Sequence, residues 1–342
     1  PAIALSTATD MSVYLCIVVM GIVATRYTVL GGIEAVIWTD VVQAVVLTGG
    51  ALLALVLVAD RVDGGAGAII AQAAEADELH FYNWTWEPTF AALWVVIVGN
   101  AFSSLYPATA DQTVVQRYLS TGDPKTAARA VWTNALLTLP ITVLFFSLGT
   151  ALWAYWQAQP QGFPAGLNND AVLPLFVMQE FPVGLKGVLI AGIFAASMSS
   201  LDSSLNSVAS VLTNDYLRRW RPWTSDREAL RFARGVTIAF GIFGTATATL
   251  IAGLEYPSLW DPFLRVLNLV GGGLAGVFAL GLFTRVGGWA ALTGAAVSAV
   301  TVYLATGTDL HWMLYGMIGF GTAFFTGWLV GSDSISKAPT HK

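Results

Sequence analysis

The sequence predicts an all-α polytopic membrane protein, because long apolar runs recur along the chain and charged residues are scarce. Of the 342 residues, 56% are hydrophobic and only 11% are charged, whereas a soluble domain carries about 25% charged residues. A helix rises about 1.5 Å per residue, so roughly 20 apolar residues cross a bilayer. The single cysteine, Cys16, excludes an internal disulfide and a cysteine metal cluster.

Apolar runs of sufficient length recur about nine times. In chain order they cover residues 12–29, 33–59, 90–110, 131–155, 184–212, 232–253, 260–283, 287–305 and 311–331. The third run contains Pro107, which predicts a broken helix, and the fifth is unusually rich in hydroxyls. The glycine run 271–273 lies inside the seventh, where close helix packing or a helix break explains it better than phosphate binding. The tryptophans and tyrosines of the long connections 59–90 and 156–182 are typical of interfacial anchors.

Basic residues divide unequally between the two sets of alternate connections, and this predicts the orientation. One set holds 13 of the 16 basic residues: Arg26, Arg117, Lys125, Arg129, Arg218, Arg219, Arg221, Arg227, Arg231, Arg234, Arg285, Lys337 and Lys342. The other set holds Arg61, Lys186 and Arg265. The positive-inside rule therefore predicts a multi-pass protein of the plasma (inner) membrane, with Pro1 outside and the C-terminus in the cytoplasm.

The fifth span carries a polar face that suits a monovalent cation. Ser199 and Ser200 follow Ala196 at i+3 and i+4, so the three residues lie on one helical face. Their carbonyl and hydroxyl oxygens are the ligand type that a hard cation requires. The alternative is structural, since serines in membrane helices often bond back to the carbonyl four residues earlier and small residues let helices approach.

Ionisable residues inside spans point to function by default. Asp40 lies in the second span, Asp111 lies at the inner end of the third, and Asp202 follows the serine face by two residues. Arg265 is a fourth candidate, with snorkelling to the outer interface as its alternative. For Asp40 and Asp111 the alternative is the capping of a helix end. The co-occurrence of a serine face, a carboxylate in a span and a broken helix favours an ion and substrate site near the midplane.

Four segments resemble the solute:sodium symporter family, which includes the sodium–glucose, sodium–proline and sodium–sialic acid transporters. They are RYTVLGGIEAVIWTDVVQ (26–43), DQTVVQRYLST (111–121), KGVLIAGIFAASMSSLDSSLNSVASVLTNDY (186–216) and GGGLAGVFALGLFTR (271–285). The resemblance implies the five-plus-five inverted repeat of leucine-transporter-like proteins, present here in part.

The resemblance also implies a division of the chain. Residues 1–60 correspond to the last two helices of the first repeat, 61–89 to an extracellular loop, 90–283 to the second repeat with five core helices, 284–332 to two peripheral helices, and 333–342 to a cytoplasmic tail. In the family, the first core helix completes the principal sodium shell, and the first and third supply most substrate contacts. Both would precede Pro1, which stands in place of an initiator Met. We therefore expect an N-terminally truncated chain that does not transport by itself.

The same resemblance implies roles for individual residues. The carbonyl of Ala196 and the hydroxyls of Ser199 and Ser200 match the principal sodium site, and Asp40 matches a second sodium site found in some members. The positions that match the substrate contacts and the inner gate are Tyr106, Asp111, Gln112, Ser203, Leu264 and Arg265. Leu264 stands where sugar-transporting relatives have a glutamine, which is one point against a sugar.

The predicted function is sodium-coupled symport of a small organic solute, such as a sugar, an amino acid or a carboxylate. Na+ is the transported coupling ion, no organic cofactor is expected, and the environment is the lipid bilayer, with no nucleic-acid partner. The alternative function is a transporter-like membrane sensor module of a signalling protein, which a following kinase domain would favour. A membrane enzyme would need a catalytic cluster, and because the sequence has no visible nucleophile–base pair, we predict that the protein is not an enzyme.

Overall fold

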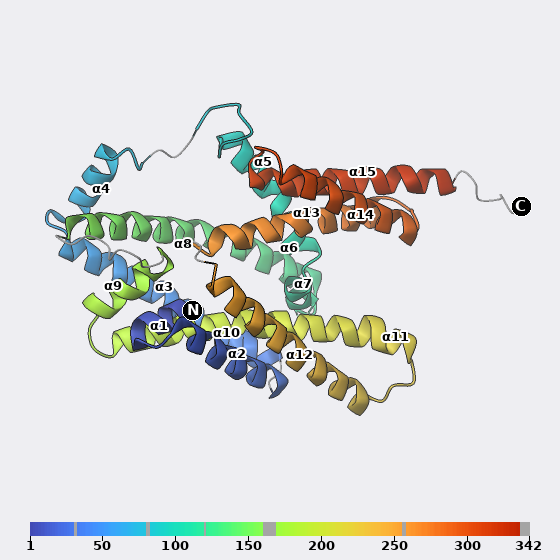
Figure 1. Ribbon diagram of the computed structural model, residues 1–342, viewed down its shortest axis with the longest axis horizontal. Coiled ribbons are helices and arrows are strands. Elements are labelled where there is room, and N and C mark those ends of the chain that lie inside the picture. Colours follow the sequence, from blue (N-terminus) through green and yellow to red (C-terminus); the bar gives the residue numbers. More distant parts are fainter. Residues whose placement is uncertain (31–32, 80–82, 120, 160–168, 255–257, 336–342) are drawn as a thin grey trace, which may run out of the picture. The chain divides into compact units, whose positions relative to one another are not determined.

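The computed structural model describes residues 1–30, 33–79, 83–119, 121–159, 169–254 and 258–335, without the side chains of 33–39, 119, 261, 265 and 332–335. These described residues form helices and turns and no strand (Figure 1). Eight of the helices are long and apolar enough to cross a membrane, and one bent pair would make a ninth span. The all-α, multi-span prediction is therefore confirmed. The chain divides into two compact units, one from residues 1–79 and 128–258 and the other from 80–127 and 259–342.

The first unit contains most of the long helices. Its elements are α1 (Ala2–Thr9), α2 (Val13–Leu30), α3 (Ile33–Arg61), α4 (Gly65–Glu75), α8 (Pro124–Ala158, from residue 128), η1 (Asn169–Ala171), α9 (Val172–Glu180), α10 (Leu185–Val211), η2 (Leu212–Leu217), α11 (Arg218–Trp220) and α12 (Asp226–Ala252). α10 continues without a break through the π-helical η2 into α11, so that one candidate span runs from Leu185 to Trp220.

α2 and α12 pack through a glycine and a threonine four residues apart on each helix. A methyl group on Gly21 of α2 would overlap the side chain of Thr245 in α12, and a methyl group on Gly241 of α12 would overlap that of Thr25 in α2. The Thr245 hydroxyl donates to the Gly241 carbonyl at 2.8 Å, so this hydroxyl has its hydrogen-bond acceptor within α12. Small residues that permit close backbone approach are the usual means of joining helices in lipid.

The two long connections of the first unit contain helices. α4 lies within the predicted loop 61–89, and α9 lies within the connection that follows α8. Phe176 of α9 is fully buried and meets the ring of Tyr155 edge-on. The Tyr155 hydroxyl donates to Glu180 at 2.9 Å, and the other carboxylate oxygen of Glu180 lies 2.7 Å from Arg61 Nε. These contacts attach the end of α9 to the ends of α3 and α8.

The second unit contains a bent helix pair and three helices packed side by side (Figure 1). Its elements are α5 (Leu93–Ser103), α6 (Leu105–Thr109), α7 (Gln112–Leu119), α13 (Trp260–Phe283), α14 (Gly288–Ala305), η3 (Trp312–Leu314) and α15 (Tyr315–Ile335). α13 passes through the glycine run 271–273 without a break. A methyl group on Gly272 would overlap the Gly316 carbonyl of α15, and one on Gly273 would lie 2.7 Å from the Ser298 hydroxyl of α14. Close packing, one of the two explanations considered for this run, is confirmed.

Candidate ion and substrate sites

Two of the residues predicted to bind sodium meet inside the first unit. Ser199 of α10 is buried, and its hydroxyl donates a hydrogen bond to a carboxylate oxygen of Asp40 in α3. The two helices approach closely because α10 has a glycine where they meet: a methyl group on Gly192 would lie 2.7 Å from Val46 of α3. A hydroxyl has one hydrogen to donate and two lone pairs. Because Asp40 takes the hydrogen, the lone pairs of Ser199 remain available to a cation.

A second carboxylate is buried next to this contact. Asp202, one helical turn after Ser199, is 3% exposed. Thr28 of α2 lies with its hydroxyl 2.5 Å from Asp202 Oδ1 and 2.9 Å from the Ala24 carbonyl. Asp40 and Asp202 both contact side chains of neighbouring helices next to Ser199, so two carboxylates lie in the same part of α10, where α3 and α2 pack against it. A region of low dielectric with this much acidic oxygen attracts a cation.

The remaining members of the serine face differ in their contacts. Ala196 and Ser203 are half-buried, and Ser200 is exposed. The Ser200 hydroxyl lies 3.4 Å from the Ala196 carbonyl, which is the back-bond that the structural alternative anticipated. The same contact places a hydroxyl oxygen and a carbonyl oxygen side by side, so the geometry is also that of two neighbouring cation ligands. Its length makes it a weak hydrogen bond that a cation can replace.

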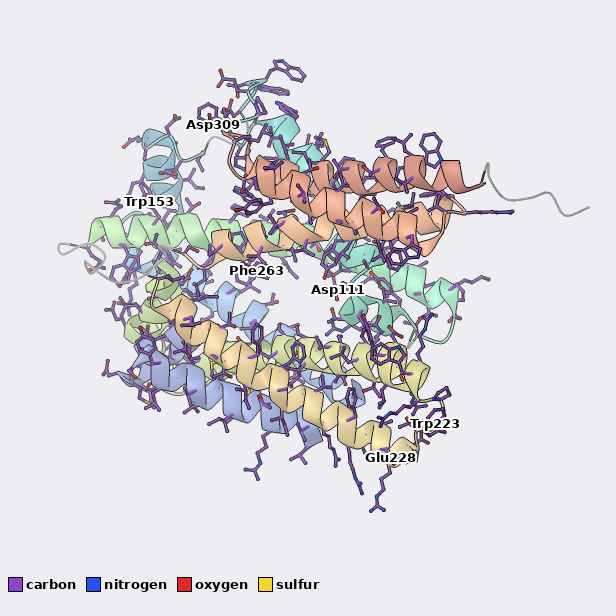
Figure 2. All side chains as sticks on the ribbon, turned by 45° about the vertical axis from the view of Figure 1, so that its right-hand side comes forward. Asp111, Trp153, Trp223, Glu228, Phe263 and Asp309 are labelled. Atoms are coloured by element: carbon purple, nitrogen blue, oxygen red, sulfur yellow. The ribbon has the colours of Figure 1, made fainter. Side chains whose placement is uncertain are left out.

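The predicted break in the third span lies in the second unit. The segments Leu93–Thr109 and Gln112–Tyr118 are inclined by 62° to each other. Pro107 lies inside the short α6 and not at the bend itself. A helix can hold a proline in its first turn, because the N–H that proline lacks would have no partner within the helix there. The bend follows Thr109. Asp111 lies at this bend (Figure 2), where its Oδ1 accepts from the backbone N–H and the hydroxyl of Thr113 at 2.8 and 2.7 Å.

Asp111 therefore caps α7, which begins at the next residue, as the alternative interpretation proposed. Tyr106 of α6 packs against α13, where a methyl group on Gly271 would lie 3.2 Å from its ring. Gln112 is half-buried at the start of α7. These three predicted gate and substrate residues thus gather around one helix break.

Leu264, also predicted to face the substrate, is half-buried in α13, and its carbonyl accepts from the Asn268 side chain at 3.0 Å. The side chain of Arg265 lies outside the described residues. Asn268 is 3% exposed, and the Ser103 hydroxyl of α5 donates to its Oδ1 at 2.5 Å. This pair joins the helix before the bend to α13.

Sequence reasoning missed Thr28 and Asn268. Asn268 offered a signal, since an amide in the apolar run after Trp260 has to find a partner inside the bundle. Thr28 offered none, because a threonine in a membrane helix usually bonds to its own backbone, and this one is also within reach of Ala24.

Comparison with known proteins agrees with this arrangement of helices. The model of the sodium:solute symporter family matches residues 1–297. The sodium/sialic acid symporter SiaT of Proteus mirabilis is 39% identical over 89% of this chain, which covers 62% of that protein. The sodium/sialic acid symporter NanT of Aliivibrio fischeri is 37% identical over 100% of this chain, which covers 70% of that protein.

A solved structure has the same fold. It is the substrate-bound outward-open state of a sodium-coupled sialic acid symporter, 36% identical, with a TM-score of 0.86 over 99% of this chain and 70% of the other. The fold is thus that of a polytopic membrane protein of the leucine-transporter-like class. The chain belongs to the sodium:solute symporter family. The repeat boundaries and the individual site residues stay predictions.

Proposed function

We propose that the protein is a symporter that couples the inward movement of Na+ to the uptake of a small organic solute. The observation that carries this proposal is the contact between Ser199 and Asp40, which joins α10 to α3 and gathers hydroxyl and carboxylate oxygens inside a membrane helix bundle. Hard cations are bound in proteins by oxygens of these types. The relatives reported above are named as symporters, so the sensor alternative has no observation in its favour.

The proposed ion ligands are the Ala196 carbonyl and the hydroxyls of Ser199 and Ser200, with Asp40 as a ligand of a second ion or as the group that orients Ser199. A cation bound at this face stabilises whichever conformation brings those oxygens together. Coupling requires only that the ion and the solute both prefer that conformation. Each positive charge that enters across 100 mV adds about 2.3 kcal/mol to the driving force.

The bend between α6 and α7 supports the proposed solute site in the second unit. A broken helix frees backbone oxygens and N–H groups near the midplane, where symporters bind their solutes. Tyr106, Asp111, Gln112 and Leu264 are the side chains that we propose for this site. The solute that we propose as the first probe is sialic acid, because both named relatives transport it. It is an acidic sugar derivative, and the other candidates are sugars, amino acids and carboxylates.

The test is uptake of labelled sialic acid by proteoliposomes that hold the full-length gene product, with Na+ or choline outside. We expect uptake only with Na+. Ser200→Ala removes one proposed oxygen ligand and should raise the half-saturating Na+ concentration about tenfold, which corresponds to about 1.4 kcal/mol, while the amount of protein stays the same.

Ser204→Ala is the matched control. Ser204 lies one turn after Ser200, is also exposed, and bonds back to the Ser200 carbonyl at 2.9 Å. It should leave Na+ dependence unchanged. Equal uptake in choline would contradict symport, and equal effects of the two substitutions would make Ser200 a structural residue.

We also propose that the connection between α11 and α12 faces the cytoplasm and that α4 faces outward. The only cysteine, Cys16, is buried, so an added cysteine can be labelled selectively. A membrane-impermeant thiol reagent applied outside intact cells should label Gly67→Cys and should label Pro222→Cys only after permeabilisation. The reverse pattern would overturn this orientation.

A further inference from the structure

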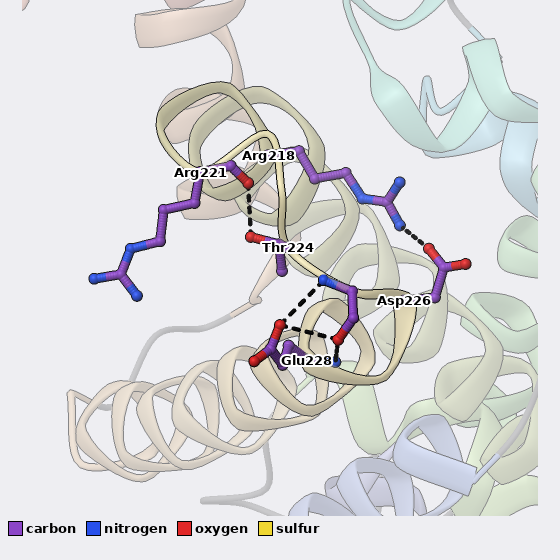
Figure 3. A network of polar contacts seen from close by, with 6 residues as sticks. Arg218, Arg221, Thr224, Asp226 and Glu228 are labelled. Carbon is purple, nitrogen blue, oxygen red and sulfur yellow. Dashed lines mark hydrogen bonds and ion pairs between the residues drawn. The ribbon is translucent and has the colours of Figure 1, made fainter.

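Six arginines lie close together at the connection between α11 and α12. Arg218 is the one with an ion pair, through its Nη2 atom 2.7 Å from Asp226 (Figure 3). The other five are Arg219, Arg221, Arg227, Arg231 and Arg234; all are exposed. Among the described residues none of them forms an ion pair within 4.0 Å, and Arg231 and Arg221 lie near enough to Glu228 to interact with it electrostatically. We call these five residues the arginine patch. Exposed guanidinium groups in such number create a strong positive potential.

The connection is held in one conformation by its own polar contacts. The Ser225 hydroxyl accepts from the Glu228 N–H, and the Glu228 carboxylate in turn accepts from the Ser225 N–H at 3.0 Å, which is a complete capping box (Figure 3). The Thr224 hydroxyl donates to the Arg221 carbonyl at 2.7 Å. These contacts fix the backbone of the turn, and with it the positions from which the arginine side chains extend.

Three members of the patch form a stripe along α12. Arg227, Arg231 and Arg234 are spaced i, i+4 and i+7 and so lie on one face. α12 packs against α2 at Gly241 and Thr245, which continue the face of the stripe two to three turns beyond Arg234. At the level of the stripe this face is open, since all three arginines are exposed.

The level of the stripe matches that of lipid headgroups. The apolar part of α12 begins after Arg234, and the preceding residues from Asp226 cover about 13 Å of helix. The polar zone on each side of a bilayer is about 5–8 Å deep. Arg231 and Arg234 thus lie where lipid phosphates lie.

We propose that the arginine patch binds the headgroup of an anionic phospholipid, with the stripe on α12 holding its phosphate. Guanidinium groups bind phosphate oxygens through paired, charge-assisted hydrogen bonds. Basic clusters next to a transmembrane helix attract anionic lipids. A zwitterionic lipid has the same phosphate but also a cation, which the patch repels. This inference goes beyond the proposed transport function and does not depend on it.

The experiment is native mass spectrometry of the detergent-solubilised chain, titrated with phosphatidylglycerol, phosphatidylcholine or inorganic phosphate. The unmodified chain should bind phosphatidylglycerol more tightly than phosphatidylcholine. The triple variant R227Q/R231Q/R234Q should lose at least tenfold in affinity for phosphatidylglycerol, since each basic residue near an anionic surface contributes about fivefold. Binding of phosphatidylcholine should not change.

The control variant K125Q/R129Q/R285Q removes equal charge from exposed positions near other helix ends, and it should lose less than twofold. The single variant R231Q, which perturbs folding less, should lose about fivefold. Equal affinity for the two lipids, an equal loss in the control variant or an unchanged R231Q overturns the proposal. If inorganic phosphate displaces phosphatidylglycerol at equal concentration, the patch is a site for free phosphate and the lipid assignment is wrong.

Discussion

Ser199 of α10 donates its hydroxyl hydrogen to the carboxylate of Asp40 in α3, across a separation of 159 positions in the sequence. The contact fixes the direction of the Ser199 lone pairs, because the hydrogen can point only toward Asp40. If those lone pairs bind Na+, Asp40 and Ser199 act as one unit, and their effects on ion affinity are not independent.

A double-mutant cycle with Asp40→Asn and Ser199→Ala tests this coupling in the full-length gene product. Each single substitution should raise the half-saturating Na+ concentration of uptake, and Asp40→Asn by at least tenfold, since a hydrogen bond to a charged group is worth about 1.5–3 kcal/mol. The double variant should be little worse than the poorer single variant. Strictly additive effects would show that the two residues serve Na+ separately.

The Thr28–Asp202 contact predicts a difference in stability between two threonine substitutions. Thr28→Val keeps the shape but removes the donor from a buried carboxylate, which costs about 1–3 kcal/mol, whereas Thr28→Ser keeps the hydroxyl. We expect a lower thermal midpoint for Thr28→Val in detergent and a midpoint near that of the unmodified chain for Thr28→Ser.

Thr237 provides the control for this experiment. It is also buried in the first unit, but its hydroxyl bonds only to the Ala233 carbonyl of its own helix, at 3.0 Å. Thr237→Val should therefore be nearly neutral. A drop as large as that of Thr28→Val would mean that the hydroxyl-to-methyl change itself, and not Asp202, determines the loss.

The sequence was sufficient for the long spanning helices because apolar runs and their charged ends are local properties, whereas α4 and α9, inside the long connections, were not predicted. The span predicted at 260–283 coincides with α13, and that predicted at 12–29 is displaced by one residue from α2. The broken third span was also predictable, since Pro107 restricts the helix locally, although the bend falls at residues 110 and 111, three and four positions beyond it.

Contacts between helices were harder to predict from the sequence, because the sequence of one helix does not show which other helix it packs against. Asp202 and Thr28 are 174 positions apart, and Asn268 and Ser103 are 165 apart. The paired glycine and threonine residues of α2 and α12 were visible in the sequence as one pattern repeated, Gly21 with Thr25 and Gly241 with Thr245. Small residues four apart on both helices are a usable sign of pairing.

The contact between α13 and α15 predicts opposite effects for two glycine substitutions in the same helix. Gly272→Ala forces a methyl group against the Gly316 carbonyl, and backbone cannot move aside without separating the helices. We expect a loss of about 1–3 kcal/mol, measured as unfolding in a denaturing detergent. Gly281 has no atom within 4 Å of an added methyl group. Gly281→Ala should be neutral or stabilising by up to about 1 kcal/mol through helix propensity, and a loss equal to that of Gly272→Ala would exclude the packing explanation.

Asp123 precedes α8, and its hydrogen bonds predict that the start of this helix is less stable at low pH. Asp123 accepts from the Thr126 hydroxyl at 2.5 Å and from the N–H groups of Thr126 and Lys125 at 2.9 Å. The hydrogen bond from the Thr126 side chain and those from the backbone lower the pKa of this carboxyl. Because this pKa is lower in the folded protein than in the unfolded chain, the ionised carboxylate stabilises the helix start above the unfolded pKa of about 4. This stabilisation is lost as the pH falls through the folded pKa.

Amide hydrogen exchange at the first turn of α8 measures this effect after correction for the intrinsic pH dependence of exchange. In the unmodified chain, protection should be full at neutral pH and should decrease below about pH 4. Asp123→Ala should lack protection at every pH because no cap remains. Asp123→Asn keeps an acceptor that cannot titrate, and asparagine is a good N-cap, so its protection should stay constant over the same range. An acid-induced loss in Asp123→Asn equal to that in the unmodified chain would place the titrating group elsewhere.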